Sequence, residues 1–225
     1  MMVYFKANQY ILNSILMKNI FLMLTIIFAI GCKDSPKVKQ EVLENTDSTS
    51  LSEIDTKIND SLLLEKGKMY AQTTQKVLGK NLMLNIQKNG PLGAVAFCNE
   101  KAYPLTDSMA IVHHAKIKRV SDKPRNQNNK ASKKELEYIE FFKSKINNNE
   151  SYEPILTNEN GVTNFYSPIV TNTMCLNCHG VPETNIDPKV TQLLIDKYPY
   201  DEAIGYKENE VRGIWSIRFK DEQNK

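Results

Sequence analysis

The segment MCLNCHGVPE (residues 174–183) places Cys175, Cys178 and His179 within five positions, although the chain has only four cysteines and three histidines. A disulfide or redox pair would use the two thiols but would give His179 no role. Tetrahedral zinc needs four ligands, and the sequence holds no second CxxC pair. A c-type haem uses all three residues, because two thiols attach to the porphyrin and the imidazole binds the iron. The segment therefore predicts one covalent haem c per chain.

Covalent haem attachment implies export, and the N-terminal sequence fits this expectation. In residues 17–32, Lys18 is followed by an apolar run over positions 20–30, which is too short to span a bilayer. The run ends in Gly-Cys, which resembles a bacterial lipoprotein signal whose cysteine becomes the lipidated first mature residue. We expect Met17 to be the true start, Cys32 to carry the lipid, and the domain to lie in the periplasm or cell envelope. An uncleaved anchor or a plain signal peptide is the alternative.

Cys98 is then the one cysteine without an assigned role. A free thiol in an oxidising compartment is exposed to oxidation unless it is buried or bound. The second axial position of a haem iron is an available partner, so Cys98 is a candidate distal ligand. It is equally an ordinary small buried residue. The rival distal ligands are His113, His114, Met109 and Met174.

Basic residues concentrate in positions 116–134, which hold eight lysines and arginines and one acid, Asp122. This segment is a solvated surface, a holder of haem propionates through Arg119 or Arg125, or a docking site for an acidic redox partner. Without residues 1–31 the chain keeps 27 basic and 26 acidic residues, since only two lysines of the original 29 against 26 are lost. Such a balance disfavours a general polyanion binder, and export excludes nucleic acid as a partner.

The remaining pattern predicts a single α+β domain. Residues 1–31 form the signal segment, the polar stretch 32–53 a flexible tether, and residues 54–225 the domain. A helical pattern starts at Ile54, breaks at positions 89–91 and resumes, with a second break expected near Pro104. Further helices are predicted at 133–147 and after Asp187. Strands are predicted at 116–121, at 211–219, and as two segments within 152–170 that meet at 158–161.

Four blocks in this order resemble one known family: GAVAFCNEKA, IKRVSDKPRNQNN, YSPIVTNTMCLNCHG and YPYDEAIGYKENEVRG. They look like the PAS-like single-haem c-type domain family, and the resemblance spans about residues 54–220. It implies a PAS-like antiparallel sheet with flanking helices, preceded by a long N-terminal helix. It also implies covalent haem with His179 and Cys98 as the axial pair. The segment RNQNN (125–129) lacks the proline that usually follows in this family.

These observations predict an exported mono-haem c-type protein that senses redox state or a small gas such as carbon monoxide or nitric oxide. The predicted segments include no signalling module, so we expect such a sensor to act through an unidentified redox or signalling protein. A one-electron carrier is the alternative. A peroxidase-type enzyme is the third possibility, with only His113 and His114 available as distal acid–base groups. No catalytic residue is expected.

Overall fold

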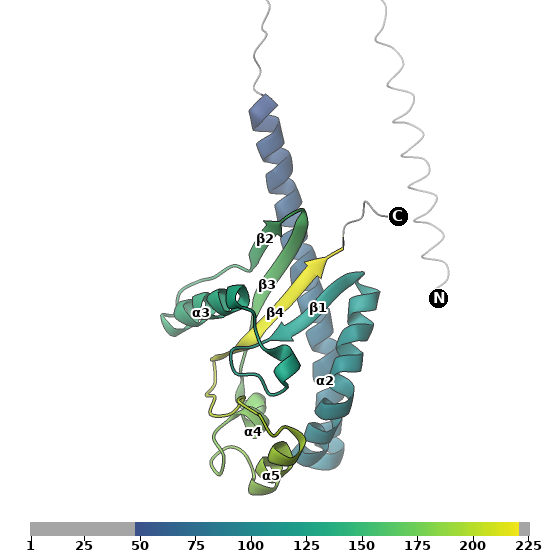
Figure 1. Ribbon diagram of the computed structural model, residues 1–225, viewed down its shortest axis with the longest axis vertical. Coiled ribbons are helices and arrows are strands. Elements are labelled where there is room, and N and C mark those ends of the chain that lie inside the picture. The colour runs from purple at the N-terminus through teal and green to yellow at the C-terminus, as the bar shows by residue number, and fades with distance from the viewer. Residues whose placement is uncertain (1–47, 221–225) are drawn as a thin grey trace, which may run out of the picture. The chain divides into compact units, whose positions relative to one another are not determined.

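The computed structural model describes residues 48–220, with side chains from residue 57 onward. The predicted signal segment, Cys32 and most of the tether lie outside the described residues. Figure 1 labels the elements, which run in the order α2 (Ser48–Val112), β1 (Ala115–Val120), η1 (Gln127–Asn129), α3 (Lys133–Asn147), β2 (Ile155–Glu159), β3 (Val162–Val170), η2 (Thr173–Cys175), α4 (Leu176–His179), α5 (Pro188–Lys197) and β4 (Val211–Phe219). The predicted α+β class is confirmed. No helix within residues 48–220 has the length and apolar character needed to cross a membrane.

Helix α2 consists of two helical segments that meet at Gly90, the middle of the predicted break. Gly90 has φ 64° and ψ −171°, a conformation that side chains with a Cβ rarely adopt, so the chain reverses direction there. The two halves lie side by side (Figure 1), and Thr73 Oγ1 of the first half lies 2.8 Å from Nε2 of His113, the residue that follows the second half. The helix begins at Ser48, earlier than the periodicity predicts.

The expected break near Pro104 is wrong, because the second half of α2 continues through this proline to Val112. Proline removes one backbone N–H and leaves the carbonyl four residues earlier, that of Glu100, without its helical partner. Pro104 and Glu100 both lie on the exposed side of the helix, where water can bond that carbonyl. The cost of the proline is therefore small enough for the helix to continue.

All four predicted strands are present, and they form one antiparallel sheet in the order β1-β4-β3-β2. Strands β2 and β3 are joined at Asn160 and Gly161, whose φ angles are 52° and 77°. Two consecutive residues with positive φ are typical of the tight hairpin turn that suits the twist of paired strands. Strand β4 lies inside the sheet, although it is the last element of the described chain.

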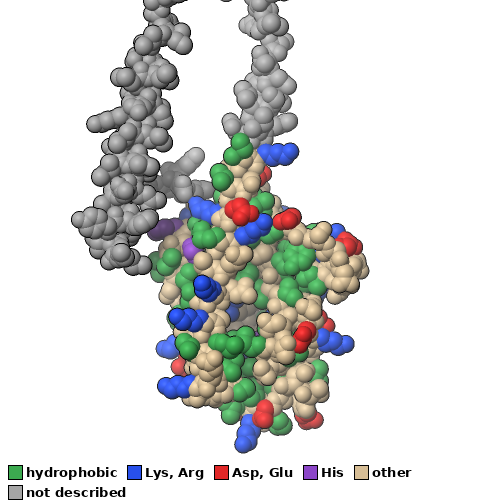
Figure 2. Space-filling model, turned by 180° about the vertical axis from the view of Figure 1, so that it is seen from behind, with side chains coloured by type: hydrophobic (Ala, Val, Ile, Leu, Met, Phe, Trp, Pro, Cys, Tyr) green, Lys and Arg blue, Asp and Glu red, His purple; other side chains and the backbone are tan. Residues whose placement is uncertain are grey.

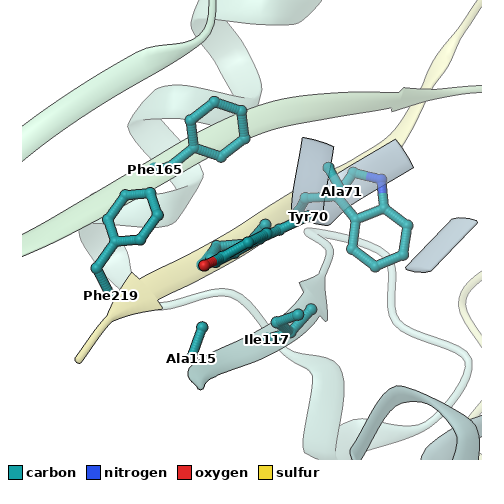
Figure 3. Close-up of a cluster of buried hydrophobic side chains, with 8 residues drawn as sticks. Tyr70, Ala71, Ala115, Ile117, Phe165 and Phe219 are labelled. Atoms are coloured by element: carbon teal, nitrogen blue, oxygen red, sulfur yellow. The ribbon is translucent and has the colours of Figure 1, made fainter. Parts of the chain in front are cut away.

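Helices cover both faces of the sheet. The first half of α2 packs on one face (Figure 3), in a cluster formed by Tyr70, Ala71, Ala115, Ile117, Phe165, Trp215, Ile217 and Phe219. Helix α3 packs on the other face, in a cluster formed by Val120, Ala131, Ile139, Phe142, Tyr166, Val211 and Ile214. The neighbours Ile214 and Trp215 enter opposite clusters because successive strand side chains point to opposite faces.

A third cluster joins α5 to the second half of α2 through Val95, Ile186, Val190 and Leu194. Asp187 caps α5 by accepting a hydrogen bond from the Lys189 N–H, and Pro188 occupies the first turn, as the sequence predicts. This packing fixes the segment that contains Cys175, Cys178 and His179 beside α2.

Gly67 of α2 should be essential for the packing of this helix on the sheet. A Cβ at Gly67 would lie 2.3 Å from the ring of Phe165, which is fully buried and cannot move aside. We expect Gly67→Ala to lower the free energy of unfolding by about 1–3 kcal/mol through overpacking. Gly79 lies in the same helix with nothing near its Cβ position, so Gly79→Ala should stabilise the protein by about 0.5–1 kcal/mol. Urea denaturation of both variants compares them, and equal effects would contradict the packing explanation.

Candidate cofactor-binding site

A cavity of about 280 Å³ lies at the end of the sheet, between the second half of α2, the loop after β1, the end of β3, and α4. The structure brings six sequence-predicted residues together in its lining: Cys98, Arg119, Arg125, Cys175, Cys178 and His179. They come from three parts of the chain that are distant in sequence. Part of the wall is apolar and is formed by Leu82, Ile86, Ala94, Val95 and Ile169. An apolar cavity with a few convergent polar groups is typical of a cofactor site.

The CxxCH segment is a single turn of helix. Asn172 begins it by accepting a hydrogen bond from the backbone N–H of Cys175, at 3.3 Å. Helix α4 then ends at His179, and the N–H of Gly180 bonds to the carbonyl of Leu176. Residues three and four positions apart share one face of a helix, so this turn directs Cys175, Cys178 and His179 to the same side. The spacing of the motif therefore places its two cysteines and its histidine together on one wall of the cavity.

His179 is held in one orientation by a backbone carbonyl. Its Nδ1 lies 2.7 Å from the carbonyl oxygen of Ala203 and 3.3 Å from Nε of Arg212. A carbonyl only accepts and a guanidinium only donates, so Nδ1 cannot satisfy both. The shorter contact favours Nδ1–H as donor to Ala203, which leaves the lone pair on Nε2 free. Burial, with Arg125 and Arg212 nearby, holds the pKa of His179 well below its usual value, so the imidazole stays neutral.

The loop 201–206 clamps the CxxCH segment through several hydrogen bonds. Arg125 donates from Nε to the carboxylate of Asp201 at 2.9 Å and from Nη2 to the carbonyl of Cys178 at 2.5 Å. The other carboxylate oxygen of Asp201 accepts from the N–H of Ala203 at 2.8 Å. The N–H groups of Gly205 and Tyr206 donate to the carbonyls of Gly180 and His179. The clamp therefore places the Ala203 carbonyl within hydrogen-bonding distance of Nδ1 of His179.

Arg119 and Arg125 both line the cavity, but only Arg119 is available for an anionic ligand. The guanidinium of Arg125 is occupied by Asp201 and by the backbone of Cys178, so its main contact is structural. Within residues 57–220, the guanidinium of Arg119 has neither a hydrogen bond nor an ion pair, although the residue is half-buried at the cavity wall. A cation in this position is stabilised by a negative charge placed in the cavity.

Cys98 lies on the second half of α2, in a different wall of the cavity from His179. Burial raises the pKa of the Cys98 thiol, while the charges of Arg119 and Arg125 act in the opposite direction. Burial also raises the pKa of Cys178, to about 11. Without a bound cation these thiols are protonated at neutral pH. A site that offers thiol sulfur and neutral imidazole nitrogen suits a transition metal centre such as haem iron.

Of the rival ligands, only Met174 lines the cavity among the described residues, while His113, His114 and Met109 do not. His113 stacks on Tyr70, with ring centroids 4.2 Å apart, and contacts Thr73. In residues 57–220, no group of three or more His, Cys, Asp or Glu side chains is arranged to hold a metal ion.

Sequence reasoning missed several residues of this site. Asp201 and Ala203 lie in the fourth sequence block that resembles the family, but their loop meets the CxxCH segment only in the folded chain, and the block alone does not reveal this contact. Arg212 lies on β4 and bonds to Ser121 Oγ at 2.8 Å, beside the ring of His179. Of the aromatic residues in the C-terminal part of the chain, Tyr198 lines the cavity, Trp215 belongs to the core, and Tyr200 is 76% exposed.

Replacing Asp201 should cost more stability than breaking an exposed ion pair. The side chains of Arg125 and Asp201 are only 13% and 9% exposed, so Asp201→Asn leaves a buried cation without its counter-charge. We expect the free energy of unfolding to fall by about 3–5 kcal/mol. The control is Glu159→Gln, which breaks the pair with Lys134, whose side chains are 53% and 44% exposed. Denaturation of both variants at pH 7 is the measurement, and an equally small effect of Asp201→Asn would show that the clamp contributes little.

Comparison with known proteins identifies the family of the chain. The crystal structure of the cyanobacterial heme-protein Tll0287 is similar, with 17% sequence identity, a TM-score of 0.49, and an alignment that covers 80% of this chain and 100% of that one. No curated protein matches the sequence. The family model described as Tll0287-like matches residues 38–220, most of the chain, and confirms the resemblance drawn from the four sequence blocks. The chain belongs to the Tll0287-like family.

Proposed function

We propose that this protein is an exported mono-haem c-type protein. Cys175 and Cys178 hold the haem covalently, His179 is the proximal ligand and Cys98 the distal ligand. Its role is to sense redox state or a small gas such as carbon monoxide or nitric oxide. The observation that carries this proposal is the cavity in which one thiol from α2 faces the CxxCH turn. The related cyanobacterial protein is described as a heme-protein, which supports the same assignment.

The residues of the cavity fit a haem in three respects. The two thiols of the CxxCH turn lie together on the wall, beside the neutral imidazole. The apolar side chains Ile86, Val95 and Ile169 suit a flat apolar macrocycle. The unpaired guanidinium of Arg119 suits a propionate, since guanidinium and carboxylate can form two parallel hydrogen bonds. When bound, the haem supplies one-electron chemistry and an iron that can exchange a ligand.

Export and lipid anchoring are part of the proposal and concern residues outside the described range. The apolar run over positions 20–30 and the Gly-Cys pair that ends at Cys32 support them. The protein would then be attached to a membrane by its N-terminus and would face an extracytoplasmic compartment. Membrane fractionation of a Cys32→Ser variant is the direct check.

The balance between sensing and electron transfer depends on Cys98. Thiolate bound to an oxidised iron is stabilised by the metal charge, but burial opposes the ionised form of this residue. In a haem-loaded protein, reduction would remove one positive charge from the iron, so Cys98 would be held less firmly in the reduced state. A ligand that leaves in one oxidation state supports sensing. The alternative, a one-electron carrier, is supported by the presence of candidate ligands on both sides of the cavity. A peroxidase-type site is less well supported, because His113 contacts Thr73 instead of lining the cavity.

The covalent attachment can be tested directly. Acid–acetone extraction of protein matured with the cytochrome c machinery should leave the haem on the polypeptide. The double variant Cys175→Ser/Cys178→Ser should lose all of it, because no thioether bond can form. Denaturing electrophoresis with a peroxidase-type haem stain is the measurement. Extraction of the haem from the wild-type chain would sink the assignment.

The distal ligand can be assigned by comparing three single variants. We expect Cys98→Ser to abolish a thiolate-type low-spin signal in the electron paramagnetic resonance spectrum of the oxidised protein. His113→Ala and His114→Ala should retain this signal, since neither residue lines the cavity. If a histidine variant abolishes the signal and Cys98→Ser preserves it, the ligand pair is bis-histidine and the sensing mechanism loses its basis.

A further inference from the structure

A second cavity of about 410 Å³ forms a groove between the second half of α2 and β1, the edge strand of the sheet. Its lining includes the basic residues Lys116, Lys118, Arg119 and Lys220, against a single acid, Asp107. Basic side chains gather along this side of the molecule, on the left in Figure 2. We call this surface the α2–β1 groove.

Three lysines of the α2–β1 groove lack an ion-pair partner in the described residues, as do other exposed lysines such as Lys57 and Lys189. Lys68, Lys134, Lys143 and Lys145 each form an ion pair with a glutamate or an aspartate. Within the described chain, Lys116, Lys118 and Lys220 are exposed and form none. Lys116 also stands directly opposite Arg218 in the β1–β4 ladder, where like charges cost stability. The basic cluster is therefore present despite a local energetic penalty.

The groove and the cofactor cavity share a wall. Tyr103, Arg119 and Asn129 line both, and the Tyr103 hydroxyl donates a hydrogen bond to Asn129 Oδ1 at 2.7 Å. A group seated in the groove is thus one layer of side chains away from the cavity. The groove also has an apolar end, where Ile111 is 73% exposed and the adjacent Val112 is 64% exposed. Exposed apolar residues beside a charged rim are typical of small, transient protein interfaces.

We propose that the α2–β1 groove is the docking surface for an acidic redox protein that exchanges one electron with the cofactor in the cavity, a proposal that rests on the proposed function. The lysines attract the carboxylates of the partner, and Ile111 and Val112 contact an apolar patch on it. One electron leaves the redox centre of one protein and is taken up by the other, and no bond forms or breaks. Docking at the shared wall of Tyr103, Arg119 and Asn129 keeps the distance between the two centres short.

The docking surface is tested with a peptide of ten glutamates as an acidic probe. Amide chemical shifts of the holoprotein should change at α2 near Ile111 and along β1. At low salt, Lys116→Glu/Lys118→Glu should weaken peptide binding at least about tenfold. The matched control is Lys57→Glu/Lys189→Glu, which changes the net charge equally at two exposed lysines outside the groove. This control should weaken binding no more than about threefold. The Lys116 substitution relieves the repulsion with Arg218, so a weaker interaction does not reflect unfolding.

Three results would overturn the docking proposal. The first is equal weakening in both double variants, because net charge alone would then explain binding. The second is the absence of shift changes at the groove. The third is binding of anionic phosphatidylglycerol vesicles through Lys116 and Lys118 without binding of the peptide, which would make the groove a lipid contact.

Electron exchange is tested separately with small charged reagents. Lys116→Glu/Lys118→Glu should slow oxidation of the reduced holoprotein by anionic ferricyanide and speed its oxidation by a cationic cobalt complex, each by at least about threefold at low salt. Unchanged rates would show that electrons do not pass the groove and would overturn the proposal. A chain that carries no haem would give no redox signal at all. That result would overturn the proposed function, while the peptide measurement still reports on the groove.

Discussion

The hydrogen bond between Nδ1 of His179 and the carbonyl of Ala203 is the contact on which the geometry of the site depends. It fixes the tautomer of a neutral imidazole and turns Nε2 toward the cavity. The carbonyl is held in this position because Asp201 accepts a hydrogen bond from the N–H of Ala203, while Arg125 bonds to Asp201, to the CxxCH turn and, at 3.3 Å, to the Ala203 carbonyl itself. Orientation of a ligating histidine by a second group is a general device in metal sites, since it lowers the cost of ordering the ring when the metal binds.

The cavity is built by elements that also stabilise the fold, so the site and the core are not independent. The first half of α2 packs on the sheet through Tyr70 and Ala71 and then contributes Leu82 and Ile86 to the cavity wall. Reversal at Gly90 brings the second half back, with Cys98 on the wall and Val95 against α5. One long helical hairpin thereby connects the core of the sheet to the position of the candidate distal ligand.

Much of the fold follows from local patterns in the sequence. The strands, the break at Gly90, the cap at Asp187 and the capping box of Ser132 and Glu135 are set by residues close together in the chain. The CxxCH turn is local in the same sense. The clamp is not predictable in this way, because Arg125 and Asp201 are far apart in sequence. They belong to two different blocks of the family resemblance, and neither block shows that the two residues meet. At Pro104 a local pattern gave a wrong prediction. The proline predicts a break in the helix, but the helix continues because the carbonyl that loses its partner is on the exposed side and can bond to water.

The position of Cys98 on this helical hairpin gives a physical basis for distinguishing an electron carrier from a sensor. An electron carrier works best when the ligands stay in place in both oxidation states, because little reorganisation then accompanies each transfer. A sensor needs an element with two arrangements whose balance depends on the ligand. In this fold the element is the second half of α2, which carries Cys98 and Val95. It ends at Val112, and the next residue, His113, stacks on Tyr70 of the core. Release of Cys98 would remove one of the restraints that hold this half-helix against the CxxCH turn, and the remaining restraints, at Val95 and His113, would decide whether the helix moves.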